Sequence, residues 1–354
     1  MEPIISGIQQ IGVGIPDVYG AWDWYRQALG FDVPVFDDPG VAGNMTRYTG
    51  GKAQSRHAVL AINLQGGGGM EIWQYTSRQP QPADFAIQMG DLGIYAAIIK
   101  TQDIDSAYEA LSKQENCVIG AVEKTPEGGR AFYIRDPYGN IFRIEQADGY
   151  FMDTGAATAG IAGCVIGVSD MDASMRFYRE ILGYDAVLYD RSGQFDDIAM
   201  LPGGGTPFRR VRLGHGKPRM GAFSRLLGAT HIELVQALGR KPVRIFENRY
   251  WGDLGFIHLC LDINGMTHMR ALCKEKGSPF TVDSNPEEGT FDMGEAAGHF
   301  SYIEDPDGTL IEFVETHKVP ILKKIGWYLD LRKRNPKKPL PNWMLRTMKW
   351  SRKR

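Results

Sequence analysis

The chain has 354 residues, a length that is large for one compact core and predicts about two domains. Hydrophobic residues make up 43% and charged residues 23%, as in an ordinary globular protein, and no apolar stretch approaches the ~20 residues of a transmembrane helix. The N-terminus lacks a basic region followed by an apolar run, so we expect a cytoplasmic protein. Cys117, Cys164, Cys260 and Cys273 lack metal-type spacing and are expected to be buried free thiols.

The first elements predicted along the chain are a strand, a turn and a helix in residues 7–30. Residues 8–15 are apolar and β-prone, Asp17 can cap a helix, and Gly30 can end it. The same pattern returns in residues 160–183, with Asp170 as the cap, at a constant offset of 153 residues. The chain therefore contains one scaffold twice.

A second pair of matching segments follows in each half. Residues 70–74 match residues 232–236, and the Gly-Asp-Leu-Gly sequence at 90–93 returns at 252–255, both at an offset of 162. Each copy precedes a predicted helix, at 103–113 and 266–276, and each half closes on an Asp-Pro-x-Gly turn and a strand. Each half thus divides into two strand-helix-strand-strand-strand modules. Since one such module leaves a sheet face bare, two must curl together to bury it.

This four-module pattern over residues 7–317 resembles the vicinal oxygen chelate superfamily, which includes glyoxalase I, methylmalonyl-CoA epimerase, extradiol dioxygenases and the bleomycin- and fosfomycin-resistance proteins. The resemblance implies an α+β fold with two tandem glyoxalase-like domains at residues 1–149 and 150–317. Four βαβββ modules would form two cup-shaped half-barrels, with one divalent metal (Zn, Ni, Co, Mn or Fe) inside at least one of them. A basic tail, residues 318–354, would follow.

The superfamily places its metal ligands on the first and last strands of a module. Carried over in module order, these positions are Gln10 and Glu71, Ala96 and Arg143, Gly163 and Glu233, and His258 and Glu312. Histidine and carboxylate occur together in the fourth module and are both absent from the second. Glu312 stands in an apolar strand, where a buried carboxylate requires a cation or several hydrogen-bond donors. We therefore predict a metal site around His258 and Glu312.

Two pairings of the modules are compatible with the sequence. If neighbours pair, His258 and Glu312 meet Glu233, with His231 as a supporting residue or replacement ligand. If the first module pairs with the fourth, they meet Gln10 and Glu71, a set that resembles the full set of some glyoxalases. We favour the pairing of neighbours, because adjacent elements usually pack together.

By resemblance, the function is that of a metal-dependent isomerase or lyase of the glyoxalase and epimerase kind. The metal would hold two oxygens of a small substrate and stabilise an enediolate, with Glu312 or Glu233 as the base. One alternative is an extradiol-type iron dioxygenase, which needs two histidines and one carboxylate and hence His231. The other is a non-catalytic binding or resistance protein that uses the cup without a metal.

The tail from residue 318 onward is strongly basic. It holds 13 lysine and arginine residues against one acid, Asp330, a net of +12, so with −2 overall the preceding residues carry −14. Because it also holds apolar residues, it can lie on an anionic membrane surface or fold back onto the acidic body, and we favour the second. The expected partners are a small-molecule substrate but no nucleic acid, with peripheral membrane contact as an option, in a monomer or homodimer.

Overall fold

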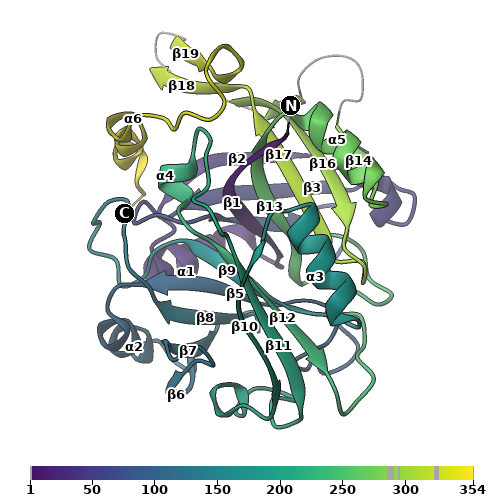
Figure 1. The fold of residues 1–354 in the computed structure, drawn as a ribbon. Coiled ribbons are helices and arrows are strands. Elements are labelled where there is room, and N and C mark those ends of the chain that lie inside the picture. Colours follow the sequence, from purple (N-terminus) through teal and green to yellow (C-terminus); the bar gives the residue numbers. More distant parts are fainter. Residues whose placement is uncertain (1, 285–290, 294–295, 323–326, 354) are drawn as a thin grey trace.

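The computed structural model describes residues 2–284, 291–293, 296–322 and 327–353, and shows two curved β-sheets that pack against each other (Figure 1). The helices in this part of the chain are α1 (Val18–Leu29), α2 (Ile104–Ser112), α3 (Met171–Glu180), α4 (Ser224–Leu227), α5 (Met266–Glu275) and α6 (Asn342–Arg346), with the 3₁₀ helices η1 (Gly43–Tyr48), η2 (Asp196–Ile198), η4 (Leu331–Lys333) and η5 (Thr347–Ser351). No helix in these described ranges is long and apolar enough to cross a membrane.

The first sheet combines the first module with the fourth. Its strands are β1 (Ile4–Gly14), β2 (Val33–Val41), β3 (Ser55–Ile62), β4 (Gly69–Tyr75), β13 (Gly255–Asn264), β14 (Val282–Asp283), β15 (Phe291–Met293), β16 (Ala296–Glu304) and β17 (Leu310–Thr316). Their order is β14-β16-β17-β13-β1-β4-β3-β2, with β15 paired to β16. The antiparallel pair of β1 and β13 joins the two modules at the centre.

The second sheet combines the second module with the third. Its strands are β5 (Gly93–Thr101), β6 (Val118–Lys124), β7 (Arg130–Arg135), β8 (Ile141–Gln146), β9 (Ile161–Gly167), β10 (Ala186–Gly193), β11 (Phe208–Gly214) and β12 (His231–Ala237). Their order is β10-β11-β12-β9-β5-β8-β7-β6, and the antiparallel pair of β5 and β9 forms the central join.

The predicted α+β fold of four modules in two cup-shaped half-barrels is confirmed, but the favoured pairing is wrong. Neighbouring modules share a sheet only at the middle of the chain, where the second meets the third. The first and fourth modules meet because β1 and β13 are both long and stay paired from Ile4 opposite Asn264 to Gly14 opposite Gly255. Each sequence half, 1–149 or 150–317, therefore supplies one module to each sheet.

The helices α1, α2 and α3 begin at the aspartates where the sequence predicted helices to start. The carboxylate of Asp17 accepts hydrogen bonds from the backbone N–H groups of the first turn of α1, and Gly30 ends that helix at φ 70°. Asp103 and Asp170 cap α2 and α3 in the same way. The four cysteines are free and buried, as expected.

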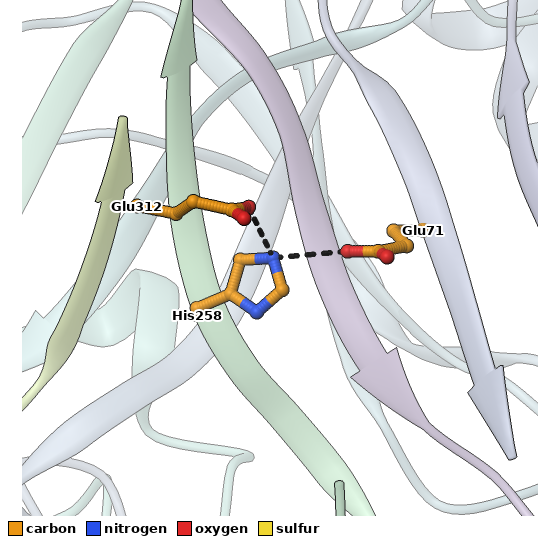
Figure 2. A group of neighbouring side chains, drawn as sticks. All are labelled: Glu71, His258 and Glu312. Atoms are coloured by element: carbon orange, nitrogen blue, oxygen red, sulfur yellow. Dashed lines mark ion pairs between the residues drawn. The ribbon is translucent and has the colours of Figure 1, made fainter. Parts of the chain in front are cut away.

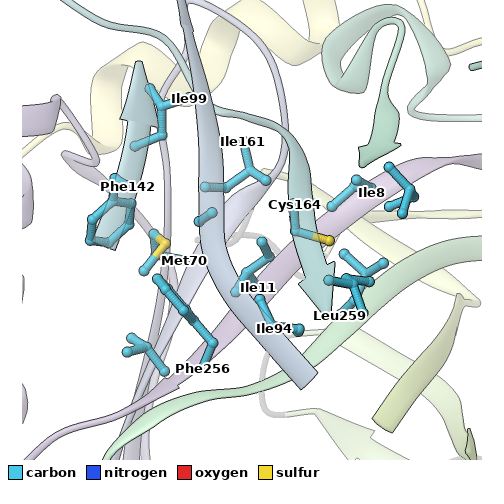
Figure 3. Close-up of a cluster of buried hydrophobic side chains, with 14 of the residues drawn as sticks. Ile8, Ile11, Met70, Ile94, Ile99, Phe142, Ile161, Cys164, Phe256 and Leu259 are labelled. Carbon is cyan, nitrogen blue, oxygen red and sulfur yellow. The ribbon is translucent and has the colours of Figure 1, made fainter. Parts of the chain in front are cut away.

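The main hydrophobic core lies between the two sheets. Figure 3 shows side chains from the first sheet meeting side chains from the second, and all of them are buried: Ile8, Ile11, Met70, Phe256 and Leu259 against Ile94, Ile99, Phe142, Ile161 and Cys164. Burial of an aliphatic or aromatic side chain of this size contributes about 2 kcal/mol. The face of each sheet that points away from this core lines the cup formed by that sheet.

The basic tail folds back onto the body of the protein, as favoured above. It begins with the hairpin of β18 (Lys318–Leu322) and β19 (Trp327–Asp330). Leu331, Leu340 and Leu345 are then buried in a cluster with side chains of the first module, among them Val33 and Ile62. Within its described residues, the tail thus has an inner, apolar side that is packed.

We predict that Leu345→Ala lowers the free energy of unfolding by about 3 kcal/mol, because it leaves a cavity under α6. Trp343→Ala, two residues away, should change it by about 0.5 kcal/mol or less, since the side chain of Trp343 is 64% exposed. Urea denaturation of both variants measures the difference. Equal effects would contradict the packing of the tail against the first module.

Candidate metal centre

His258 is turned into the cup of the first sheet by an irregularity in β13. Gly12 of β1 is paired with His258, but the next pair is Val13 with Phe256, so Ile257 is an extra residue. Such a β-bulge re-aims side chains. Phe256 and Leu259 consequently enter the core between the sheets, whereas Ile257 joins a cluster inside the cup. His258 also faces this cup, although both of its sequence neighbours are apolar.

Two glutamates reach His258 from the strands on either side of the central pair. Glu71 lies on β4, which flanks β1, and Glu312 lies on β17, which flanks β13. Oε2 of each carboxylate lies 3.1 Å from Nε2 of His258 (Figure 2). The cluster therefore draws on both sequence halves, and it unites the two ligand positions of the first and fourth modules that carry acids.

The raised pKa of His258 indicates that the two carboxylates favour a positive charge between them. Burial by itself lowers the pKa of His258, but the carboxylates of Glu312 and Glu71 outweigh it and raise the pKa to about 9. Both ring nitrogens of His258, and Oε2 of Glu312, are buried without a hydrogen-bond partner in the described part of the chain. The two 3.1 Å contacts thus place charges close together without forming well-aligned hydrogen bonds.

These side chains fit a divalent metal ion. One imidazole nitrogen and two carboxylate oxygens lie within 4.8 Å of one another, and such donors suit zinc and the related transition metals. Gln10 adds a neutral amide beside them. Its Nε2 donates a hydrogen bond of 3.3 Å to Oε2 of Glu71, while its Oε1 is buried without a partner in the described residues.

A cavity of about 130 Å³ opens onto the cluster and is lined by Gln10, Glu71 and Glu312. Aromatic side chains form much of the remaining wall. Trp251 stacks on the imidazole of His258, with a ring-centroid distance of 6.2 Å and planes 12° apart, and Tyr302 contacts it edge-on at 5.6 Å. The cluster therefore sits at the base of a small, largely apolar pocket.

The corresponding place in the second sheet holds an arginine. Arg143 of β8 matches Glu312, and Ala96 of β5 matches His258. The buried guanidinium groups of Arg143 and Arg210 both form ion pairs with Glu233. Burial raises the pKa of Glu233, but these arginines outweigh it and lower the pKa to about 2. Glu233 is therefore neutralised by cations that belong to the protein.

The predictions that Glu233 joins His258 as a ligand and can act as the base are wrong. Glu233 lies in the other sheet, and a carboxylate held ionised by two arginines is a weak base. His231 also lies in the second sheet, 3.1 Å from Glu145, where burial and Arg212 lower its pKa to about 4. Glu71, given before only as an alternative with Gln10, takes the place beside His258.

Three residues that shape the cluster were missed from the sequence. Trp251 and Tyr302 gave no signal of their own, because aromatic residues are common in any core. Gly12 did give one, since it is a glycine inside an apolar strand, which often marks the close approach of another group. A Cβ at this position would lie 2.3 Å from Cε1 of His258. Gly12 therefore makes room for the imidazole ring.

We predict that Gly12→Ala lowers the affinity for a divalent metal by about tenfold to a hundredfold, because it displaces the ring of His258. Gly43→Ala is a matched control in the wall of the same cavity, where an added Cβ meets no atom within 4 Å. Titration of both variants with Zn²⁺ or Co²⁺ measures the affinities. Unchanged affinity in Gly12→Ala would show that His258 does not hold the metal.

Comparison with known proteins is consistent with this architecture. The family model of the Glyoxalase/Bleomycin resistance protein/Dioxygenase superfamily matches residues 7–144 and 160–313. A probable lactoylglutathione lyase of Vibrio parahaemolyticus is 22% identical over 150 residues, which are 42% of this chain and 84% of that protein.

Solved structures share the fold at low sequence identity. The match to glyoxalase I from Zea mays covers 89% of this chain and 92% of the other, with 14% identity and a TM-score of 0.52. The match to a putative dioxygenase from Bacillus subtilis covers 88% and 86%, with 14% identity and a TM-score of 0.55. Because the family model covers most of its length, this chain belongs to the Glyoxalase/Bleomycin resistance protein/Dioxygenase superfamily, the vicinal oxygen chelate superfamily that its four modules resemble.

Proposed function

We propose that this protein is a metal-dependent lyase or isomerase of the glyoxalase and epimerase kind, with Glu71, His258 and Glu312 as its metal ligands. The convergence of one imidazole nitrogen and two carboxylate oxygens within 4.8 Å, in a buried cup, supports this proposal most directly. Gln10 on β1, which contacts Glu71, offers a further oxygen, its Oε1. Three protein ligands leave room for substrate oxygens, as a catalytic site requires.

The chemistry that a divalent ion supplies here is Lewis acidity, which stabilises negative charge on two adjacent substrate oxygens while a proton is removed. The protein's own residues orient the substrate and exclude water. Trp73, Trp251 and Tyr302 line the pocket, and their apolar surfaces strengthen every charge interaction inside it. This arrangement suits a small α-hydroxy carbonyl compound or a related substrate.

Glu312 is the residue best placed to accept the proton. Glu312 lines the pocket, and its Oε2 has no hydrogen-bond partner in the described structure, whereas Oε2 of Glu71 already accepts a hydrogen bond from Gln10. A carboxylate with a free lone pair facing the substrate can act as a general base. We therefore assign proton transfer to Glu312 and orientation of the ligand set to Glu71 and Gln10.

The donor set favours this function over the two alternatives. An iron dioxygenase of the extradiol type uses two histidines and one carboxylate, and the cluster has one histidine and two carboxylates, with His231 in the other sheet. A binding protein that works without metal would have no need for three ionisable groups packed around one point.

We expect the purified protein to hold about one divalent metal per chain, and Glu71→Ala, His258→Ala and Glu312→Ala each to remove it, because each takes away one of three ligands. Glu233→Gln should retain the metal, although it costs about 3 kcal/mol of stability, because Arg143 and Arg210 lose a buried carboxylate that they share and keep only Glu145 and Asp197. Elemental analysis of the folded proteins measures this.

The paired variant Arg143→Met/Glu233→Met is a second control, since it removes a buried carboxylate together with one of its arginines. It should hold as much metal as the unmodified protein. Loss of metal in this variant, with retention in Glu71→Ala, would reverse the assignment of the ligands.

The reaction class is tested by proton exchange in deuterium oxide. With small α-hydroxy carbonyl compounds, the metal-loaded protein should exchange the proton next to the carbonyl, as followed by the loss of its NMR signal. Glu312→Gln should slow this exchange by about a hundredfold or more, the usual contribution of a general base. Binding of the compounds without any exchange would instead indicate a binding protein, and oxygen consumption with catechols a dioxygenase.

A further inference from the structure

We propose that the outer face of the C-terminal helical segment binds the surface of an anionic phospholipid membrane. This outer face consists of Trp343, Arg346, Lys349 and Trp350, in α6 and η5. The proposal does not depend on the metal centre, and a failure of either leaves the other unaffected.

The spacing of these residues places them on one side of the segment. Residues advance by about 100° in an α-helix and about 120° in a 3₁₀ helix, so Trp350 lies about 40° from Trp343 around the axis. Exposure agrees with this geometry, because Trp343 is 64% and Trp350 is 77% exposed, while Leu345 on the opposite side is 2% exposed. The two tryptophans therefore form one outward stripe.

The segment is held firmly from its other side. Leu340 and Leu345 are buried in the cluster under the tail, and the N–H of Leu340 donates a hydrogen bond of 2.8 Å to the carbonyl of Ala222. Arg352 forms an ion pair of 2.7 Å with Asp32. Because the inner contacts are already made, the exposed tryptophans are not needed to hold the tail in place.

Basic side chains surround the stripe and lack acidic partners. Arg346 and Lys349 are exposed beside the tryptophans, and neither forms an ion pair within the described residues. The same holds for further exposed lysines of the tail, namely Lys333, Lys337, Lys338 and Lys353. Arg346 and Lys349 therefore form a small positive patch beside the tryptophans, on a protein whose residues before the tail carry a net charge of −14. Such a patch is complementary to anionic lipid headgroups.

The two exposed tryptophans favour a lipid membrane as the partner over another polyanion such as a nucleic acid. Tryptophan prefers the interface between headgroups and hydrocarbon, where its ring is buried and its N–H remains hydrated. Proteins that bind single-stranded nucleic acid instead stack bases in a basic groove. Here the tryptophans protrude from a helical ridge, exposed to 64% and 77%, and they line neither the cavity at the metal centre nor two further cavities of the described structure. A ridge of this kind can insert into a lipid surface.

The test is co-sedimentation of the full-length protein with vesicles, either of phosphatidylcholine alone or of phosphatidylcholine mixed with phosphatidylglycerol. We expect binding to the anionic vesicles and little to the neutral ones, and weaker binding as salt is added. Arg346→Gln/Lys349→Gln should lower the partition coefficient by about 25-fold, at about fivefold for each basic side chain. Trp343→Ala/Trp350→Ala should lower it by about tenfold or more, because buried apolar area is lost.

Matched controls change the same kinds of side chain elsewhere on the surface. Lys124→Gln/Lys241→Gln removes two exposed lysines outside the tail, and Val187→Ala/Leu188→Ala removes apolar side chains that are 52% and 53% exposed. Both should bind vesicles like the unmodified protein. Metal content should remain constant in all these variants.

Three results would overturn the proposal. The first is equal binding to neutral and anionic vesicles, or none to either. The second is binding that the controls reduce as much as the outer-face variants. The third is a dimer, or a complex with single-stranded RNA, that depends on Trp343 and Trp350 while vesicles are not bound.

Discussion

The antiparallel pairing of β1 with β13 is the contact on which both the first sheet and the candidate metal centre depend. It joins the first module to the fourth across more than two hundred residues of chain, from Ile4 opposite Asn264 to Gly14 opposite Gly255. In the same strand, Gly12 is paired with His258 on one side and with Glu71 on the other. β1 therefore both unites the two halves of the protein and leaves the space that the imidazole occupies.

The two sheets meet one physical requirement, the neutralisation of buried carboxylates inside a cup, in different ways. In the second sheet the guanidinium groups of Arg143 and Arg210 neutralise Glu233. In the first sheet the imidazole of His258 faces Glu71 and Glu312, Gln10 donates a hydrogen bond to Glu71, and polar atoms without a partner remain among the described residues. A guanidinium fills its site permanently and offers no open coordination position, whereas a metal ion can also bind substrate oxygens. This difference is our reason for placing the proposed chemistry in the first sheet.

Much of the architecture could be predicted because it is encoded locally. The repeats at offsets of 153 and 162 residues, the aspartate caps and the Asp-Pro-x-Gly turns each depend on residues close together in the chain, and they predicted four modules and most of their helices. His258 and Glu312 were predicted by comparing the repeated modules and by the resemblance to the superfamily, with the apolar setting of Glu312 as a local signal. Trp251, Tyr302 and the bulge at Ile257 could not be, because their effect depends on which strands lie opposite.

The sequence by itself therefore determined the four modules, and together with the resemblance it indicated His258 and Glu312 as candidate ligands. It did not determine which modules share a sheet, since links of similar length allow either pairing, and the preference for neighbours holds only for the second and third modules. Strand pairing is non-local, and it is decided by the match of whole strands and by the core between the sheets. Only the tertiary structure could place Glu71 beside His258, and Glu233 between two arginines.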